Sequence, residues 1–355
     1  MTKTNVALIF GGQSGEHEVS LLSTTSVYKH IDKEKYNVFT IGITKEGKWL
    51  YYQGSEDNIQ NGEWENLANE NVEINLLPIG NKEVGIVFED GKVEKIDVLF
   101  PVLHGPYGED GTIQGLFEMS AIPYVGCGVL ASSVGMDKLI CKNVFAQIGL
   151  PQVEYTYTTK WQYSKNQELE INKIEDILNY PIFVKPANMG SSVGVSKAHD
   201  REELIQGIEE ALKYDSRVVL EKGINAREIE VAVLGNDEVK ASIPGEIKPA
   251  KEFYDYEDKY IDGASTFEIP PRLEESVIEE IREMAIEAFK GIDGSGLSRV
   301  DFFVDREDGK IYINEINTLP GFTNVSMYPK MWEATGLKYE ELIDSLIKLA
   351  IQSSK

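Results

Sequence analysis

Cysteine is scarce in this sequence. The 355 residues include two, Cys127 and Cys141, and neither has the spacing of a metal or redox motif. Isolated thiols suit a reducing compartment, where they mostly serve packing. No apolar run is long enough to cross a bilayer, and the short run 6–10 does not make a signal peptide. We therefore expect a cytoplasmic protein without a membrane partner.

Positive charge is also in short supply: 35 Lys and Arg residues face 59 Asp and Glu residues, which gives a formal net charge of −24. Nucleic acid or an anionic membrane would require a broad basic face, so neither is an expected partner. A small phosphate ligand held by a few local lysines stays compatible with this charge. The length, with 42% hydrophobic and 26% charged residues, is typical of a globular protein of two or three domains.

The most informative pattern is a pair of strands joined by a tight turn at Asp308-Gly309. Side chains alternate along a strand, so Arg299 and Asp301 share one face, and Glu315 and Asn317 share one face of the partner strand. With the strands in register, two carboxylates, an amide oxygen and a guanidinium form one patch. Oxygen ligands without His or Cys suit Mg²⁺.

Two interpretations of this patch stay open. Acidic and basic side chains on the wet face of a strand often only pair with each other. The Pro320-Gly321 turn that follows favours a functional site, because it frees backbone N–H groups where a developing oxyanion could be stabilised.

The chain begins with a strand at 6–10, a glycine-containing loop and an amphipathic helix at about 19–31. A dinucleotide-binding fold is only weakly indicated, because the glycines depart from G-x-G-x-x-G and the next strand, 38–43, ends without an acidic residue. Glu16 in the loop either serves a ligand or simply favours the helix N-terminus through the helix dipole.

A further strand at 97–103 ends in a loop with three glycines and His104. Open α/β sheets bind ligands at this end of their strands, so we expect His104 to be functional. A helix at 112–120 closes this first α/β unit.

A second unit starts near Ala131. Its helix opens at Asp137-Lys138 and is expected to carry Lys142 on its surface. The polar stretch 158–172 is predicted to be mobile. A strand ending at Lys185 then enters a Gly/Ser-rich loop, 187–195, whose N–H groups can cradle phosphate beside the lysine. The loop lacks the P-loop pattern, and a plain hairpin turn is the alternative.

Glu221 and Glu228 lie at the end of one strand and the start of the next. Backbone groups at such a crossover can contact an adenine edge, and a carboxylate there can accept both ribose hydroxyls. Glu230 shares the face of Glu228. Residues 246–268 are predicted to form an aromatic-rich lid loop, and helices are expected at 274–290 and about 339–351.

These motifs together resemble those of the D-alanine–D-alanine ligases, in the same order and over the whole chain. Each motif is unspecific alone, but the combination is specific. The matching segments are residues 12–20, 104–111, 136–138, 184–194, 254–260 and 314–321.

The resemblance implies an α/β (α+β) protein with a three-domain ATP-grasp fold and an N-terminal open α/β sheet domain. The expected domains are residues 1–126, with the site for the first D-alanine, a central ATP-grasp subdomain at 127–221, and a C-terminal ATP-grasp domain at 222–355. The implied activity is ATP-dependent ligation of two D-alanines through an acyl phosphate, for peptidoglycan precursor synthesis. The implied enzyme is a homodimer that uses two Mg²⁺ ions, with Mn²⁺ as an alternative.

The resemblance also assigns roles position by position. The residues implied to bind the nucleotide are Lys138, Lys185, Ser192, Val193, Glu221, Lys222, Ile224 and Glu228. The implied metal ligands are Asp301, Glu315 and Asn317.

The substrate and catalytic roles come from the same resemblance. Glu16 is implied to bind the ammonium of the first D-alanine, with His104 close by, and Ser326 the carboxylate of the second. Arg299 and the Gly321 N–H are implied to form the oxyanion site. The implied lid contacts are Lys259, which reaches the transferred phosphate, and a hydrogen-bonded link of Glu16, Ser191 and Tyr260.

Three alternatives are weighed against this assignment. A D-alanine–D-serine ligase of the same family stays open, because a small pocket rejects an added hydroxyl by only about 10²-fold, although Tyr260 favours an amino acid over a hydroxy acid. Another ATP-grasp enzyme is disfavoured by Glu16, Tyr260 and Ser326 together. A non-catalytic nucleotide-binding regulator is disfavoured because no metal ligand is missing.

Overall fold

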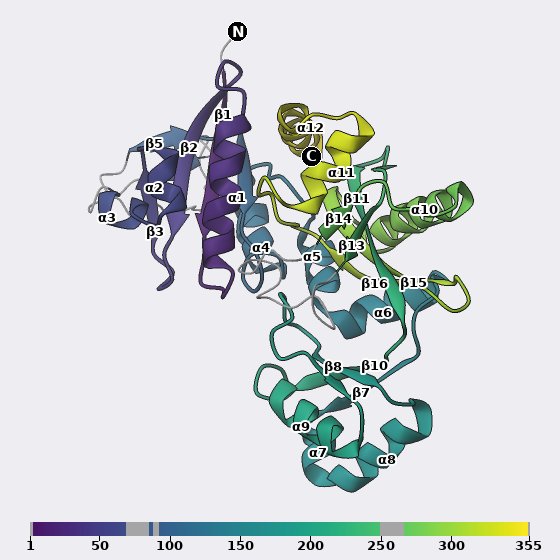
Figure 1. Cartoon of the computed structure of the whole chain (residues 1–355). Coiled ribbons are helices and arrows are strands. Elements are labelled where there is room, and N and C mark those ends of the chain that lie inside the picture. Colours follow the sequence, from purple (N-terminus) through teal and green to yellow (C-terminus); the bar gives the residue numbers. More distant parts are fainter. Residues whose placement is uncertain (1–2, 69–84, 88–91, 249–265, 354–355) are drawn as a thin grey trace.

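The computed structural model describes residues 3–68, 85–87, 92–248 and 266–353, and Figure 1 shows three groups of helices and strands. The described strands of the first group form a sheet with the order β3-β2-β1-β6. They are β1 (Thr4–Gly11), β2 (Tyr36–Ile43), β3 (Trp49–Tyr52) and β6 (Val98–Val102). β1 is parallel to both β2 and β6, so their carboxyl ends meet at one edge of the sheet.

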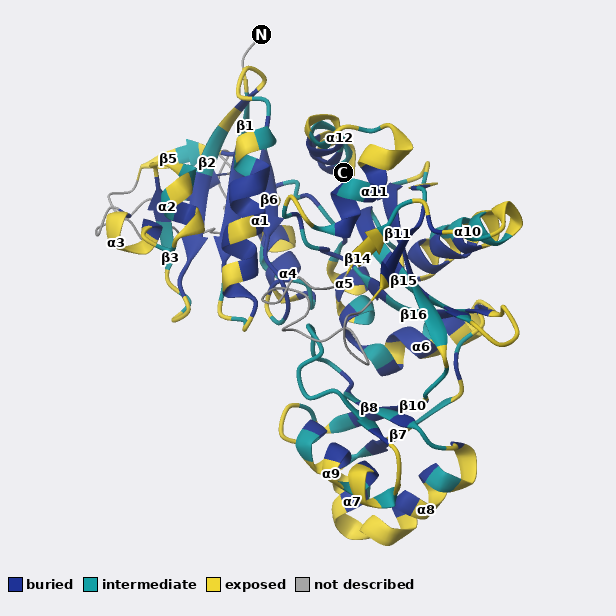
Figure 2. Cartoon of the chain, viewed as in Figure 1, coloured by how far each residue is buried: buried dark blue, intermediate teal, exposed yellow. Residues whose placement is uncertain are grey.

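The central strands of this sheet are apolar along their length because both faces are covered. Residues 6–10 of β1 are fully buried, and Figure 2 shows the strand in dark blue. The accompanying elements are α1 (His17–His30), α4 (Thr112–Ser120), the short helices α2 (Glu56–Gln60) and α3 (Trp64–Leu67), and the hairpin of β4 (Gly85–Val87) and β5 (Val93–Lys95). The strand–loop–helix prediction for this region is therefore confirmed.

The second group is an antiparallel sheet with the order β7-β10-β8-β9. Its strands are β7 (Tyr155–Thr159), β8 (Ile182–Pro186), β9 (Ser196–Ala198) and β10 (Arg217–Lys222). The helices are α7 (Lys160–Lys165), α8 (Gln167–Ile177) and α9 (Arg201–Ala211). The prediction of a mobile stretch at 158–172 is wrong, because Ile171 and Ile174 of α8 are buried in the core of this group.

The third group is a larger sheet with the order β14-β13-β11-β15-β16, with β12 paired to β11. Its strands are β11 (Ala226–Gly235), β12 (Lys240–Ala241), β13 (Gly245–Lys248), β14 (Thr266–Glu268), β15 (Gly296–Asp305) and β16 (Ile311–Asn317). Residues 246–248 and 266–268, predicted as ends of a lid loop, are paired strands instead. The rest of that loop lies outside the described residues.

Five helices pack with this sheet or beside it: α5 (Val129–Met136), α6 (Lys138–Gln147), α10 (Glu275–Gly291), α11 (Met327–Thr335) and α12 (Tyr339–Ser353). The expected helices at 274–290 and 339–351 are confirmed, whereas α11 was not anticipated. Cys127 and Cys141 are buried in the core that α5 and α6 share with α10 and β15, so their packing role is confirmed. The division of the chain at 126/127 and 221/222 stays a proposal.

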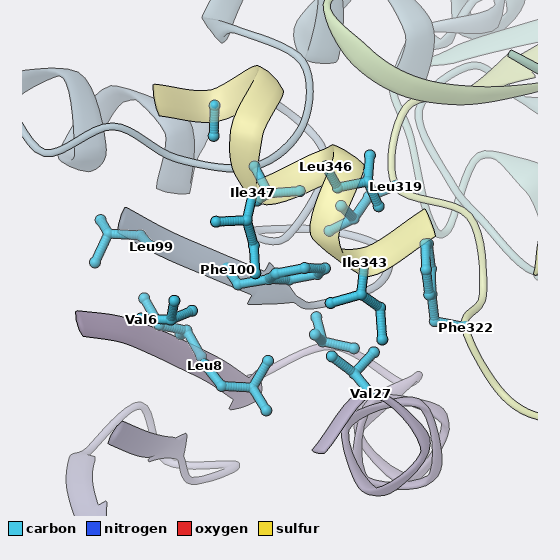
Figure 3. Packing of buried hydrophobic residues seen from close by; sticks show 14 of the residues in the cluster. Val6, Leu8, Val27, Leu99, Phe100, Leu319, Phe322, Ile343, Leu346 and Ile347 are labelled. Atoms are coloured by element: carbon cyan, nitrogen blue, oxygen red, sulfur yellow. The ribbon is translucent and has the colours of Figure 1, made fainter. Parts of the chain in front are cut away.

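The last helix joins the first sheet in one core. Ile343, Leu346 and Ile347 of α12 are buried in the same cluster as Leu8 and Phe100 of the first sheet, as Figure 3 shows. This contact fixes the first sheet against the third group and so places the carboxyl edge of β1 and β6 beside the β15–β16 hairpin. Among the helices of the described part, none is long and apolar enough to cross a membrane.

Candidate active site

A cleft of about 910 Å³ is lined by residues from all three groups. The first sheet contributes the loops that follow β1 and β6, with Glu16 and His104. The second group contributes the loop after β8, with Ser191, and the end of β10. The third group contributes the β15–β16 hairpin and the loop after β16. The three groups therefore line one space in which a ligand could be enclosed.

The hairpin patch forms as the sequence predicts. The register sets Arg299 opposite Asn317 and Asp301 opposite Glu315. Both guanidinium nitrogens Nε and Nη2 of Arg299 donate to the Asp301 carboxylate at 2.7 Å, and Asn317 Nδ2 donates to Asp301 Oδ2 at 3.1 Å. The Glu230 carboxylate lies 3.1 Å from Arg299 Nε. Burial alone would lower the pKa of Arg299, but Asp301 and Glu230 outweigh it and raise the pKa.

The donor set of this patch fits a hard cation. Asp301, Glu315 and Asn317 offer carboxylate and amide oxygens to the cleft, which is the chemistry that Mg²⁺ prefers when phosphates and water complete its shell. Each carboxylate already lies near a positive charge: Asp301 pairs with Arg299, and Glu315 Oε2 lies 3.7 Å from Lys138 Nζ. No group of three His, Cys, Asp or Glu residues suited to a metal occurs within the described ranges. The two carboxylates would therefore share a cation with an amide and with ligand oxygens.

The Gly/Ser-rich loop joins the antiparallel strands β8 and β9, so the predicted hairpin turn is present, and the loop also lines the cleft. Ser191 and Ser192 have φ of 48° and 59°, and Val193 N–H donates to the Gly190 carbonyl at 3.1 Å. Lys138 at the start of α6 reaches the same loop, where Nζ donates to the Met189 carbonyl at 2.8 Å. The loop thus has one lysine beside it and Lys185 on the preceding strand, and both lysines line the cleft.

Lys142 corrects a prediction, because it is buried and not on the surface of its helix. The side chain is 2% exposed, and Nζ lies 2.9 Å from Glu221 Oε1. Lys185 Nζ lies 2.6 Å from Glu221 Oε2. Burial would raise the pKa of Glu221, but the two lysines outweigh it and hold the pKa at about 2. Burial would lower the pKa of Lys185, but the Glu221 carboxylate raises it above its ordinary value.

The crossover from β10 to β11 supplies the remaining residues expected at a nucleotide. Lys222, Ile224 and Glu228 line the cleft beside Glu221, and Glu228 lies opposite Phe303 of β15. The Glu221 side chain points to two lysines in this structure. Its contact with adenine stays a prediction, as do the roles of the other three residues.

Glu16 connects the first sheet to the Gly/Ser-rich loop. The Ser191 hydroxyl donates to Glu16 Oε1, and the Glu16 N–H donates to Ser14 Oγ at 3.2 Å. A Cβ atom at Gly105, where φ is 71°, would lie 2.5 Å from Glu16 Oε2, so glycine lets this carboxylate keep its position. Glu16 precedes α1, and its carboxylate makes no capping hydrogen bond but accepts one from Ser191 in the cleft, which favours a role in the site. Tyr260 and Lys259 lie outside the described residues.

His104 is buried close to Glu16. Its Nε2 lies 3.1 Å from Ser23 Oγ, and its Nδ1 lies 3.1 Å from the Leu319 carbonyl. Burial lowers the pKa of the imidazole, against a smaller opposite effect of Glu16. A neutral ring is therefore held between the first sheet and the loop after β16.

Glu109 lines the same region and was not singled out from the sequence. Its Oε1 accepts the Gly105 N–H at 2.8 Å, and burial together with the nearby Glu16 raises the pKa of its carboxyl to about 8. The position of Glu109 could have indicated a role, because Glu109 lies in the same loop after β6 that His104 had already marked as a candidate ligand site. Glu230 and Lys142 were likewise missed as members of the site's charge network.

The loop after β16 brings the predicted oxyanion and carboxylate residues together. Gly321 and Ser326 both line the cleft, and a side chain at Gly321 would lie 3.0 Å from Ser326 Oγ. Ser326 Oγ accepts the Thr323 N–H at 3.0 Å, which holds this turn in place. The two predicted groups are therefore neighbours at the cleft, next to the hairpin that carries Arg299.

Comparisons with known proteins agree over the whole chain. Residues 5–127 match the family described as the D-ala D-ala ligase N-terminus, and residues 144–348 match the D-ala D-ala ligase C-terminus. A D-alanine–D-alanine ligase of Acetivibrio thermocellus is 54% identical, over 99% of this chain and 96% of that protein. One of Clostridium acetobutylicum is 52% identical, over 98% of each.

Two solved structures of ligases have a fold similar to that of this chain. A D-alanine–D-alanine ligase from Coxiella burnetii is 36% identical with a TM-score of 0.87, covering 100% of this chain and 95% of that one. A D-Ala:D-Ser ligase from Enterococcus faecalis is 37% identical with the same TM-score of 0.87, covering 98% of this chain and 100% of that one.

Proposed function

The chain belongs to the D-alanine–D-alanine ligase family, and we propose from that premise that it joins two D-alanines into D-alanyl-D-alanine while ATP becomes ADP and phosphate. The fold is the ATP-grasp fold of this family, as expected from the sequence. The observation that carries the proposal is the hydrogen bond from Ser191 to Glu16, because it closes the Gly/Ser-rich loop over the sheet that would hold the first substrate.

The chemistry needs activation, because a carboxylate is a poor electrophile. An oxygen of the first D-alanine's carboxylate attacks the γ-phosphorus of ATP, the bond to the β-phosphate oxygen breaks, and ADP leaves. The product is an acyl phosphate. The free amine of the second D-alanine, having lost one proton from its ammonium form, attacks the acyl carbon. Phosphate then leaves from a tetrahedral intermediate, the nitrogen gives up a second proton, and the amide remains.

Phosphoryl transfer depends on positioning and on neutralising negative charge. Lys138 and Lys185 flank the loop where the ATP phosphates would lie, and Ser192 and Val193 would cover them. Asp301, Glu315 and Asn317 would hold two Mg²⁺ ions, which neutralise phosphate charge when bound. The adenine would lie at Glu221, Lys222 and Ile224, with the ribose at Glu228.

Other residues of the same cleft would bind the substrates and the tetrahedral intermediate. Glu16 would bind the ammonium of the first D-alanine beside the neutral His104. Arg299 and the Gly321 N–H would stabilise the oxyanion of the tetrahedral intermediate, and Ser326 would bind the second carboxylate. The charge network of Arg299 with Asp301 and Glu230 supports this, because it fixes the guanidinium before substrate arrives.

The acyl phosphate hydrolyses readily, so water must be excluded. The family resemblance gives that task to a lid with Lys259 and Tyr260, and it also suggests a homodimer that works in the cytoplasm in peptidoglycan precursor synthesis. These parts of the proposal rest on the resemblance.

The test is ADP release measured with ATP and Mg²⁺, which is expected only after D-alanine is added. Release at the same rate without D-alanine would contradict the proposal.

The one rival that an observation favours is a D-alanine–D-serine ligase, because the Enterococcus faecalis structure with that title is as similar in fold. Relatives more than 50% identical are named for D-alanine alone. Product analysis with D-alanine, D-serine and D-lactate in equal amounts separates them, and D-alanyl-D-alanine is the expected main product.

A further inference from the structure

A buried lysine lies behind the cleft. Lys142 of α6 is 2% exposed and is not among the described residues that line the cleft, whereas Lys185 and Glu221 are. One carboxylate bridges both lysines: Glu221 Oε1 lies 2.9 Å from Lys142 Nζ, and Oε2 lies 2.6 Å from Lys185 Nζ. The bridge therefore joins a cation that faces the ligand space to one that is sealed from it.

Burial of this lysine needs a reason. A charged group taken out of water is costly, and replacing a buried ion pair by apolar residues of similar volume is often neutral or stabilising. The Tyr155 ring, whose centroid lies 5.1 Å from Nζ, attracts the ammonium, but a methionine could pack against the same ring. Packing alone would be served by a methionine here, so the positive charge calls for a different explanation.

The net charge of Lys142, Lys185 and Glu221 supplies an explanation. A pair of Lys185 and Glu221 is neutral, and the carboxylate would cancel most of the attraction of Lys185 for phosphate oxygens. With Lys142 added, the three groups carry a net charge of +1. The low pKa of Glu221 keeps the carboxylate ionised at neutral pH, so this sum holds under working conditions.

We propose that Lys142 is a positioning residue for phosphate recognition: it neutralises Glu221 from behind, so that Lys185 keeps its positive charge for a nucleotide phosphate. The inference rests on the proposed function in taking ATP as the ligand. It assigns Lys142 no contact with substrate, and it gives Glu221 a task in orienting Lys185 in addition to any contact with adenine.

The test compares Lys142→Met with the double variant Lys142→Met/Glu221→Gln. Binding of ATP and of adenosine is measured by calorimetry, and KM and kcat are measured in the ADP-release assay. The single variant leaves a neutral pair, so ATP affinity is expected to fall by about tenfold or more, which is the scale of one charged hydrogen bond. Adenosine affinity and the KM for D-alanine are expected to stay unchanged.

The double variant restores the charge of +1 and keeps an acceptor oxygen at residue 221. Its ratio of ATP affinity to adenosine affinity is expected within about threefold of the wild-type ratio, because adenosine binding records any change in the adenine contact of residue 221. If Lys142 had only a structural role, the double variant would bind ATP more weakly than the single variant, because the effects of two core substitutions would add. Melting temperatures of both variants record folding.

Two results would overturn the inference: equal losses for adenosine and ATP in the single variant, or a double variant that binds ATP more weakly than the single one. If Lys142→Met does not fold, the double variant alone decides, and a loss of about tenfold or more in the ratio of ATP affinity to adenosine affinity overturns the inference. If the wild type itself binds no ATP, the proposed function fails, which is a separate outcome.

Discussion

Ser191 donates a hydrogen bond to Glu16 across a sequence separation of 175 residues, and this contact joins the Gly/Ser-rich loop to the first sheet. Ser191 has a φ of 48°, so the turn holds it in the left-handed region that non-glycine residues rarely adopt. The contact is therefore part of how the cleft closes, and the local turn geometry alone does not explain why serine stands there.

Replacing Ser191 by alanine removes this hydrogen bond and leaves Glu16 to water or substrate. We expect kcat/KM for the first D-alanine to fall by about tenfold, the scale of one hydrogen bond to a charged group, with adenosine binding unchanged. Steady-state kinetics at saturating ATP give the measurement. Ser164, an exposed residue of α7, provides a control as Ser164→Ala, for which no change is expected. Equal kinetics for both variants would remove the contact from the mechanism.

Arg299→Ala deletes the predicted oxyanion donor. We expect kcat to fall by about 10²–10³-fold with little change in ATP affinity. The loss also leaves Asp301 without its bidentate partner, so calorimetry of ATP binding is needed beside the kinetics. A raised KM for ATP with kcat intact would show that Arg299 belongs to the nucleotide site instead.

Glu315→Gln tests the metal ligands. The amide keeps the size of the side chain but loses the charge that a hard cation requires. We expect Mg²⁺-dependent ADP release to disappear and the Mg²⁺ dependence of ATP binding to weaken. The matched control is Glu283→Gln on the exposed face of α10, and its turnover should be that of the wild type. Near-normal turnover of the Glu315 variant would exclude it as a ligand.

The stability of the ligand-free protein should depend on pH because of the Glu109 carboxyl group. Its pKa in the folded state is about 8, above the ordinary value of 4.5, so folding takes up a proton between these values and stability falls as pH rises through that window. Glu109→Gln keeps an acceptor for the Gly105 N–H without the ionisation. The variant should melt at least about 2 °C higher than the wild type at pH 7.5. No difference is expected at pH 4, and equal melting at both pH values would contradict the shift.

The core between the first sheet and α12 should carry measurable stability. Ile347 is fully buried there, so Ile347→Ala is expected to cost about 2–5 kcal/mol of unfolding free energy. Ile351 lies one turn further along the same helix and is 41% exposed. Ile351→Ala is the control, and its cost should stay below about 0.5 kcal/mol in chemical denaturation. Similar costs for the two variants would mean that the contact with the first sheet adds nothing.

The parts of the fold that the sequence predicts are those with a strong local signal. The hairpin at Asp308-Gly309 is one, because alternation and turn chemistry act within about twenty residues and fix which side chains meet. The buried strand at residues 6–10 is another. The register of Arg299 opposite Asn317 also depends on a register shift between Asp301 and Phe302, which these local rules do not predict.

The misses depend on contacts between distant residues. The burial of Lys142 requires Glu221, which belongs to another element, so no pattern around Lys142 could reveal it. The segment 158–172 is polar enough to suggest a loop, but a few apolar residues such as Ile171 suffice to bury one face of α8. The helix α11 contains Pro329, a residue that usually argues against a helix, although proline is tolerated in the first turn.

The shared core of α12 and β6 has a consequence for how the protein is made. The ribosome releases the sheet strands near residue 10 and residue 100 long before residues 343–347, whose side chains cover Phe100. During synthesis the apolar side chains around Phe100 therefore lack their contact with α12 until the final helix leaves the exit tunnel. A chain arrested before residue 339 should thus be protected by chaperones or degraded, even though every strand of that sheet has already been translated.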